Sequence, residues 1–104
     1  MPSLRSHPEA DIEAEEAAVW YEGRQEALGR DFFTELERAY TLIMESPGTW
    51  PLWPGLPESI GIRRFLLSRF PYGIAYEVSG DAIVVYAVAH LARRPGYWKD
   101  RLKA

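Results

Sequence analysis

Five of the six arginines in the second half of this 104-residue sequence lie near several aromatic residues, and these are the side chains best suited to chemistry. The arginines are Arg63, Arg64, Arg69, Arg93 and Arg94, and the aromatic residues near them are Tyr72, Tyr97 and Trp98. An arginine fork binds a phosphate through two hydrogen bonds, and an aromatic ring can stack on an unpaired base. Any single arginine is more simply explained by an ion pair within the chain. For the whole set we favour an anion-binding surface.

Two residues near the end of the chain are candidates for proton transfer. Imidazole titrates near neutral pH, which makes His90 a candidate. His90 also ends a strand of the buried type, where a hydrogen-bonded structural histidine is the more common role. Tyr97 lies in a more exposed context, and it could donate a proton if neighbouring arginines lowered its pKa.

The sequence excludes several common classes of site. Without cysteine, the chain can form neither a disulfide nor a thiolate metal site. The glycines are dispersed without the lysine of a phosphate-binding loop, and His7 and His90 lack the spacing of a metal site. No apolar run approaches the roughly 18–20 residues that span a bilayer, and no secretory signal is evident. We therefore expect a cytoplasmic protein with no cofactor and no membrane association.

Charge is divided unevenly along the chain, whose net charge is −3. Residues 1–60 hold four arginines and twelve carboxylates, a net charge of −8, whereas residues 61–104 hold eight basic residues and three carboxylates, a net charge of +5. Two interpretations remain open. The basic half binds a polyanionic partner, or an acidic pair of helices neutralises a basic sheet.

Two helices are the first elements that must position these side chains. The stretch from Pro8 to about Ala27 is rich in alanine and glutamate, with its apolar residues on one helical face. Gly29 breaks this pattern, and apolar residues at helical spacing predict a second helix from about Arg30 to Glu45. We expect an antiparallel hairpin whose carboxylate-rich face stays in water, with no acid–base pair among those carboxylates.

Three strands are predicted at residues 62–70, 74–78 and 83–89, with a weaker edge strand at 2–6. Residues 83–89 are apolar on both faces, as in a central strand that is covered on both sides. The first and third of these strands should flank the second in an antiparallel meander. The arginines of residues 63–69 and 93–94 are therefore expected to converge on one side of the sheet.

A proline-rich loop at Thr49–Ser59 carries Trp50 and Trp53. Proline at this density excludes a helix or a central strand. The two indoles either plug an end of the core, which we favour, or form an aromatic surface for a ligand.

Five short motifs follow this order of elements. They are Trp20-Tyr21-Glu22, Ile62-Arg63-Arg64-Phe65, Phe70-Pro71-Tyr72-Gly73-Ile74, Ala87-Val88-Ala89-His90 and Arg93-Arg94-Pro95-Gly96-Tyr97-Trp98. Together they resemble the RelE/ParE toxin superfamily, and more narrowly its ParE-like "plasmid stabilization" branch. The resemblance covers roughly residues 8 to 101.

The resemblance implies a single α+β domain over residues 1–104, with the order β-α-α-β-β-β and a helical hairpin on one face of a mostly antiparallel sheet. It also implies the toxin of a type II toxin–antitoxin system, neutralised by a cognate antitoxin. ParE-like members poison DNA gyrase, whereas RelE-like members cleave mRNA on the ribosome. Neither activity needs a metal.

The residues of the RelE-like ribonucleases carry over only in part. Arg64, Arg93 and Tyr97 match three catalytic positions, but the arginine expected early in the middle strand is Gly73 here. Loss of one arginine that contacts the phosphate would cost a hundredfold or more in rate. We therefore expect a ParE-like toxin that binds gyrase. The alternatives are a ribosome-dependent mRNA endoribonuclease and a non-toxic member that only binds antitoxin.

The other members of the cluster are expected to contact the nucleic-acid or protein target. They are Arg63, Arg69, His90, Arg94 and Trp98. A homodimer is also possible, because an uncovered apolar face of the sheet would favour a partner.

Overall fold

The structure, a computed structural model, describes residues 2–103. Its elements are β1 (Ser3–Ser6), α1 (Pro8–Arg24), α2 (Leu28–Glu45), η1 (Glu58–Ile60), β2 (Arg63–Leu66), β3 (Tyr72–Ser79), β4 (Ala82–His90) and η2 (Lys99–Lys103), where η1 and η2 are short 3-10 helices. The predicted α+β fold with the order β-α-α-β-β-β is confirmed. Across residues 2–103, neither α1 nor α2 is long and apolar enough to cross a membrane.

The four strands form one sheet in the order β1-β4-β3-β2. Strand β1 pairs in parallel with the first half of β4, and the other neighbours are antiparallel. Strand β4 therefore has a neighbour on each side only as far as Val85, where its pairing with β1 ends. The second half of β4 presents a free edge toward α1 and the C-terminal segment.

A bulge in β4 determines which of its residues face the helices. Ala75 pairs with Ala87 but Tyr76 pairs with Val85, so Tyr86 is the extra residue. An extra residue shifts the alternation of side chains by one position. Val85 and Val88 consequently both pack in the core beneath the helices.

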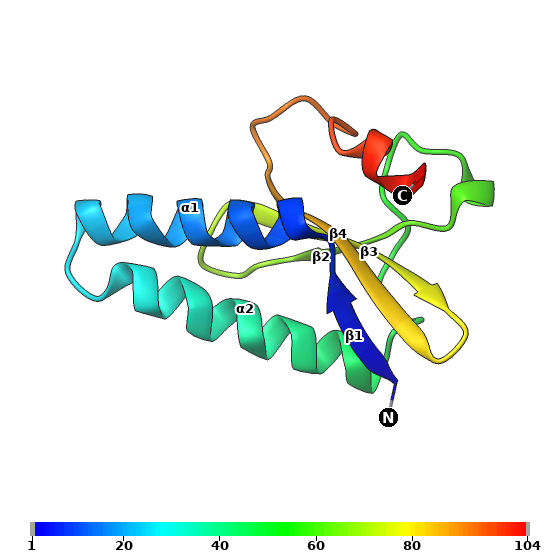
Figure 1. Cartoon of the computed structure of the whole chain (residues 1–104), viewed down its shortest axis with the longest axis horizontal. Helices are drawn as coiled ribbons and strands as arrows, with labels where there is room; N and C mark the ends of the chain where they lie inside the picture. The colour runs from blue at the N-terminus through cyan, green and yellow to red at the C-terminus, as the bar shows by residue number, and fades with distance from the viewer. Residues whose placement is uncertain (1, 104) are drawn as a thin grey trace.

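Helices α1 and α2 lie antiparallel and cover one face of the sheet (Figure 1). Four buried alanines of α1, Ala10, Ala14, Ala17 and Ala18, let the backbone of this helix approach its neighbours closely. Phe32 and Ile43 of α2 are completely buried in the same core. Burying apolar area of this kind is the main driving force of the fold.

The predicted break at Gly29 is wrong, because α1 ends at Arg24 and Gly29 lies within the first turn of α2. A Cβ atom on Gly29 would collide with the carbonyl oxygen of Ala18, so glycine is needed there for close packing of the helices. The turn is instead made by Ala27, which adopts a left-handed conformation with φ 69. The carboxylate of Glu22 accepts hydrogen bonds from the backbone N–H groups of Ala27 (2.9 Å) and Gly29 (3.0 Å) and so caps the start of α2.

The strand predicted over residues 62–70 is shorter in the structure, where β2 spans only Arg63–Leu66. Leu67 N–H still donates to the carbonyl of Tyr72 at 3.0 Å, but beyond it the N–H groups of Ser68 and Arg69 donate to the Glu35 carboxylate of α2. The outer edge of β2 is partly covered, since Arg64 N–H donates to the carbonyl of Pro51 at 2.8 Å.

The proline-rich loop and the C-terminal segment cover the other face of the sheet and lie next to each other (Figure 1). Trp53 and Trp98 pack edge to face with ring centroids 5.2 Å apart, against Ala75, Ala87 and Ala89 of the sheet. The preferred interpretation of Trp53 as part of the core is confirmed, since its residue is 8% exposed.

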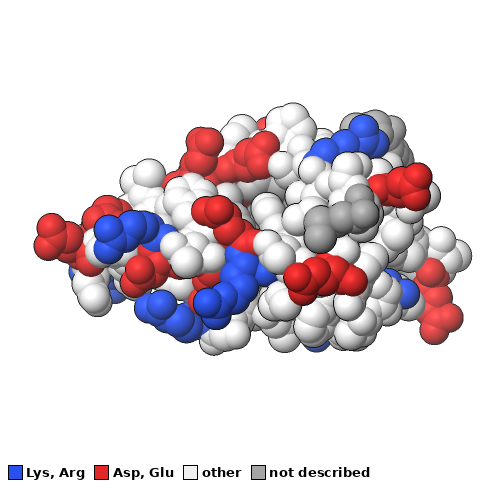
Figure 2. All heavy atoms as spheres, turned by 90° about the horizontal axis from the view of Figure 1, so that it is seen from below, with Lys and Arg blue, Asp and Glu red and all other residues white. Residues whose placement is uncertain are grey.

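Acidic and basic side chains lie interspersed on the face of the molecule that Figure 2 shows. Among the described residues, Asp31 in α2 forms an ion pair with Arg69, at 3.6 Å. Both side chains are largely exposed, so this pair contributes little to stability.

Candidate functional site

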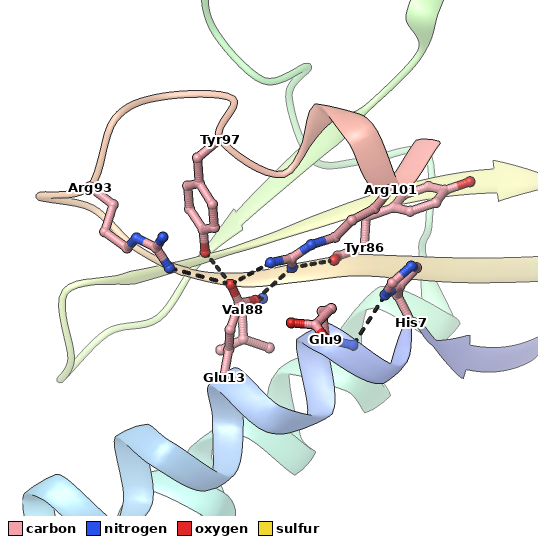
Figure 3. Close-up of polar contacts among 8 residues, drawn as sticks. All are labelled: His7, Glu9, Glu13, Tyr86, Val88, Arg93, Tyr97 and Arg101. Carbon is pink, nitrogen blue, oxygen red and sulfur yellow. Dashed lines mark hydrogen bonds and ion pairs between the residues drawn. The ribbon is translucent and has the colours of Figure 1, made fainter. Parts of the chain in front are cut away.

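The carboxylate of Glu13 is the centre of the most connected polar site among the described residues (Figure 3). Its Oε1 accepts from the backbone N–H of Val88 at 3.0 Å and from Arg101 Nη1 at 2.9 Å. Its Oε2 accepts from Arg101 Nη2 at 2.9 Å and from the Tyr97 hydroxyl. Arg93 lies 3.7 Å away as a further ion pair.

This site closes the free edge of β4. Arg101 Nη1 also donates to the carbonyl of Tyr86, the bulged residue, at 2.9 Å. A buried backbone group without a partner is costly, and Glu13 and Arg101 satisfy two such groups on β4 where no strand can. The contacts thereby tie α1 to the sheet and to the C-terminal segment.

Glu13 does not lie on a solvated face, contrary to the prediction for the helix carboxylates. Its side chain is only 11% exposed. Glu13 follows Ala10 by three residues and precedes Ala17 by four, so it shares their buried side of α1. That spacing was the available signal for Glu13, whereas no signal in the sequence pointed to Arg101.

The pKa of Tyr97 is raised rather than lowered. Burial is the main cause, and the hydrogen bond to Glu13 and the charge of that carboxylate add to it, while Arg93 and Arg101 act in the opposite direction. The two arginines do act to lower this pKa, as the sequence suggested, but burial and Glu13 outweigh them. Tyr97 is a neutral hydrogen-bond donor whose proton is already engaged by Glu13.

Arg93 lies against the same tyrosine. Its guanidinium carbon is 3.7 Å from the centroid of the Tyr97 ring, within the range of a cation–π contact. Two of the three catalytic candidates are thus brought together, but each also interacts with Glu13.

A groove of about 480 Å³ opens beside this site, between α1 and the ends of β3 and β4. Its walls are mostly aromatic and apolar, and they include Ala17, Trp20, Tyr21, Pro71, Tyr72 and Val88. Trp20 is 56% exposed and carries Arg24 over its ring at 4.7 Å. His90, Arg93 and Tyr97 lie along the same groove.

A second, smaller cavity of about 150 Å³ lies on the other side of the C-terminal loop. It brings together six of the candidate site residues from the sequence: Arg64, His90, Arg93, Arg94, Tyr97 and Trp98. The expected convergence of arginines from β2 and from the segment after β4 is therefore found for Arg64, Arg93 and Arg94.

The remaining candidates lie elsewhere or have other roles. Arg63 donates to the carbonyl of Trp50 at 2.6 Å, and Arg69 pairs with Asp31 of α2. Trp98 is 1% exposed, so its ring belongs to the core and cannot stack on a target, contrary to its assignment as a surface contact. His90 makes structural contacts, because its Nδ1 accepts from Ala92 N–H at 3.0 Å and its ring packs on Tyr72.

Neighbouring side chains fill the space that a side chain at Gly73 would need. A Cβ atom built there would lie 3.2 Å from Cη2 of Trp53 and 3.3 Å from Cδ2 of Leu91. A side chain at this position would have to displace the Trp53 ring. The arginine that the ribonucleases carry there is thus absent, and the indole of Trp53 fills its space.

No family model matches this sequence, and no curated protein matches it. Among solved structures, the chain is similar to one described as the chromosomal ParDE TA system from P. aeruginosa. That alignment has a TM-score of 0.63 and 15% sequence identity, and it covers 88% of this chain and 97% of the other. At this identity the similarity demonstrates a shared fold.

Proposed function

We propose that this protein is the toxin of a type II toxin–antitoxin pair, neutralised by a cognate antitoxin and acting on a protein target. The observation that carries the proposal is the fold, which is shared over 88% of this chain with a chain of a ParDE system. The five motifs that resemble the RelE/ParE superfamily support it from the sequence. The ParE-like character of those motifs makes DNA gyrase the target we propose.

The chemistry of the site supports binding rather than catalysis. Tyr97 and Arg93, two of the three residues that match the ribonucleases, both interact with the carboxylate of Glu13. A ribonuclease needs these groups to stabilise the charge that develops on the phosphate. The filled position at Gly73 removes a further arginine from such a site.

The groove beside α1 is the surface on which we place the antitoxin. Ile12, Val19 and Trp20 of α1 are 44%, 73% and 56% exposed, and Trp20 forms part of the groove wall. Ile12 and Val19 are seven residues apart and so lie on one side of the helix, although neither of them lines the groove. Large exposed apolar side chains that adjoin an aromatic groove are typical of protein interaction sites.

Ribosome-dependent mRNA cleavage is the second candidate, and one observation favours it. Arg64, Arg93, Arg94 and Tyr97 converge on a single cavity, as a phosphate-binding site requires. A third candidate is a non-toxic member that retains antitoxin binding.

The test is to induce the protein in a bacterial host with and without its antitoxin. The proposal predicts growth arrest that the antitoxin relieves, and arrest that persists in the Tyr97→Phe and Arg93→Ala variants. Loss of arrest in both variants, with folding retained by thermal melting, would establish the ribonuclease instead. Absence of arrest together with a stable antitoxin complex would identify the non-toxic member.

Substitution of Trp20 tests the groove. We expect Trp20→Ala to weaken antitoxin binding about 30-fold, as loss of a central aromatic contact does, when measured by calorimetry. Leu42→Ala is the matched control, because Leu42 is also an exposed apolar residue but lies on α2, outside the groove. Equal affinities of the two variants would place the antitoxin elsewhere.

A further inference from the structure

Two residues that line the small cavity behind the C-terminal loop carry buried hydrogen-bond donors without acceptors. Trp98 Nε1 and Arg64 Nε are both buried, and neither has a hydrogen-bond partner within residues 2–103. Both residues line the cavity of about 150 Å³. A buried donor without a partner is unfavourable, so such a pair indicates that an acceptor binds there.

Positive charge surrounds these donors. Arg93 and Arg94 also line the cavity, and no aspartate or glutamate is among its lining residues. Within the described part of the chain, Arg64 and Arg94 form no ion pair with a carboxylate. The acceptor that fits this environment is an anion.

The walls of the cavity hold the donors in place. Trp98 is 1% exposed and packs edge to face on Trp53, and the Arg64 guanidinium carbon lies 5.9 Å from the centroid of the Trp53 ring. The backbone of Arg64 is fixed by its hydrogen bond to Pro51. Because these groups are preorganised, little ordering is required when a ligand binds.

We infer that this cavity binds a carboxylate side chain of a protein partner, one that is flanked by apolar residues in that partner. The cavity is small, and its rim includes Leu91, which is 46% exposed, as well as Pro54 and Pro95. Such a rim suits an apolar residue beside the acid. A nucleic acid carries a series of negatively charged phosphates, which a chain with a net charge of −3 repels. A single carboxylate brings only one negative charge.

This inference deepens the proposed function, and its test uses the isolated protein so that the outcome does not depend on toxicity. The indole N–H signal of Trp98 is assigned in a nitrogen–proton NMR spectrum by its loss in Trp98→Phe. The protein is then titrated with acetyl-Leu-Glu-Leu-amide and with the matched peptide acetyl-Leu-Gln-Leu-amide. We expect the glutamate peptide to shift this signal saturably and the glutamine peptide to leave it unchanged.

Variants of the cavity complete the test. Arg64→Gln and, separately, Arg94→Gln should each weaken the glutamate peptide about tenfold, as removal of a charged hydrogen-bond donor does. Arg38→Gln is the matched control, since it removes the same charge from the exposed surface of α2. If one of the two cavity variants does not fold, the other still tests the inference.

Three results would overturn the inference. They are an indole signal that does not move with the glutamate peptide, an equal shift with both peptides, and tighter binding of the trinucleotide UUU than of the peptide. The last result would assign the cavity to RNA phosphate. Each of these leaves the proposed toxin activity to be judged by its own growth experiment.

Discussion

At the scale of single residues, Glu13 joins parts of the chain that are far apart in sequence. Its contacts with Val88 and Arg101 span 75 and 88 residues. The side chains of Glu13 and Arg101 are only 11% and 14% exposed, so solvent screens their interaction weakly. Removing one partner of such a pair leaves the other charge uncompensated, which costs more than the pair contributes.

Replacing Glu13 should therefore destabilise the fold. We expect Glu13→Ala to lower the free energy of unfolding by about 3 kcal/mol, because Arg101, Tyr97 and the Val88 N–H all lose their acceptor. The measurement is urea denaturation. Glu15→Ala, an exposed position on the same helix, should change the free energy by less than about 0.5 kcal/mol. Equal effects of the two substitutions would contradict the role given to Glu13.

The tyrosines make stability depend on pH in the alkaline range. Burial raises the pKa of Tyr76 to about 12, against the opposing charge of Arg63, and the pKa of Tyr97 is raised as well. In the unfolded chain these groups ionise near pH 10. Their contribution is therefore fully present below pH 10 and is lost as the pH rises toward 12.

Denaturation experiments between pH 8 and 12 would measure this loss. Tyr76→Phe should reduce the slope of stability against pH, and it should also cost about 1 kcal/mol near neutral pH, where the Tyr76 hydroxyl donates to the carbonyl of Pro47 at 2.7 Å. A slope that is unchanged in Tyr76→Phe would show that other groups control alkaline unfolding.

Sequence patterns located most candidate residues but not their roles. Arg64, Arg93 and Tyr97 could be predicted to lie near one another because strand order alone brings β2 beside β3 and β3 beside β4. The burial of Trp98 and the engagement of Tyr97 by Glu13 depend on packing between distant segments, which local patterns do not encode.

At the scale of elements, the connection between α1 and α2 shows why the helix boundary was misplaced. Glycine commonly ends a helix, so Gly29 predicted a break. The structure uses this glycine for contact between the helices and places the left-handed turn at Ala27. Both features depend on how closely the helices approach, which the sequence of either helix does not specify.

Two substitutions at this connection should have opposite effects. Ala27→Gly removes the strain of a left-handed alanine and should raise the free energy of unfolding by about 1 kcal/mol. Gly29→Ala forces a methyl group against the Ala18 carbonyl and should lower it by about 2 kcal/mol. Thermal melting of both variants would check this, and destabilisation by Ala27→Gly would contradict the assigned conformation.

The strands were predicted more accurately than their register. Alternation in residues 74–78 puts Ile74, Tyr76 and Val78 on one face, and the first two pack in the core, whereas Val78 is 41% exposed. The bulge at Tyr86 was not predicted, because residues 83–89 are apolar on both faces and their pattern does not fix the pairing.

At the scale of the whole molecule, part of the charge division is neutralised internally. All three ion pairs among the described residues join a helix carboxylate to an arginine of the second half of the chain. The interpretation of acidic helices that neutralise basic segments is thus correct for Arg69, Arg93 and Arg101. Arg64 and Arg94 are the arginines at the small cavity that have no such carboxylate in the described structure.

We propose that this fold acts as a toxin by binding a protein and not by cutting RNA. The most direct test is to induce the protein without its antitoxin and to map RNA 5′ ends across the genome, while measuring plasmid supercoiling in the same cells. We predict growth arrest with altered supercoiling and no new RNA ends. New 5′ ends phased to codons within translated messages would contradict the proposal that the protein does not cut RNA.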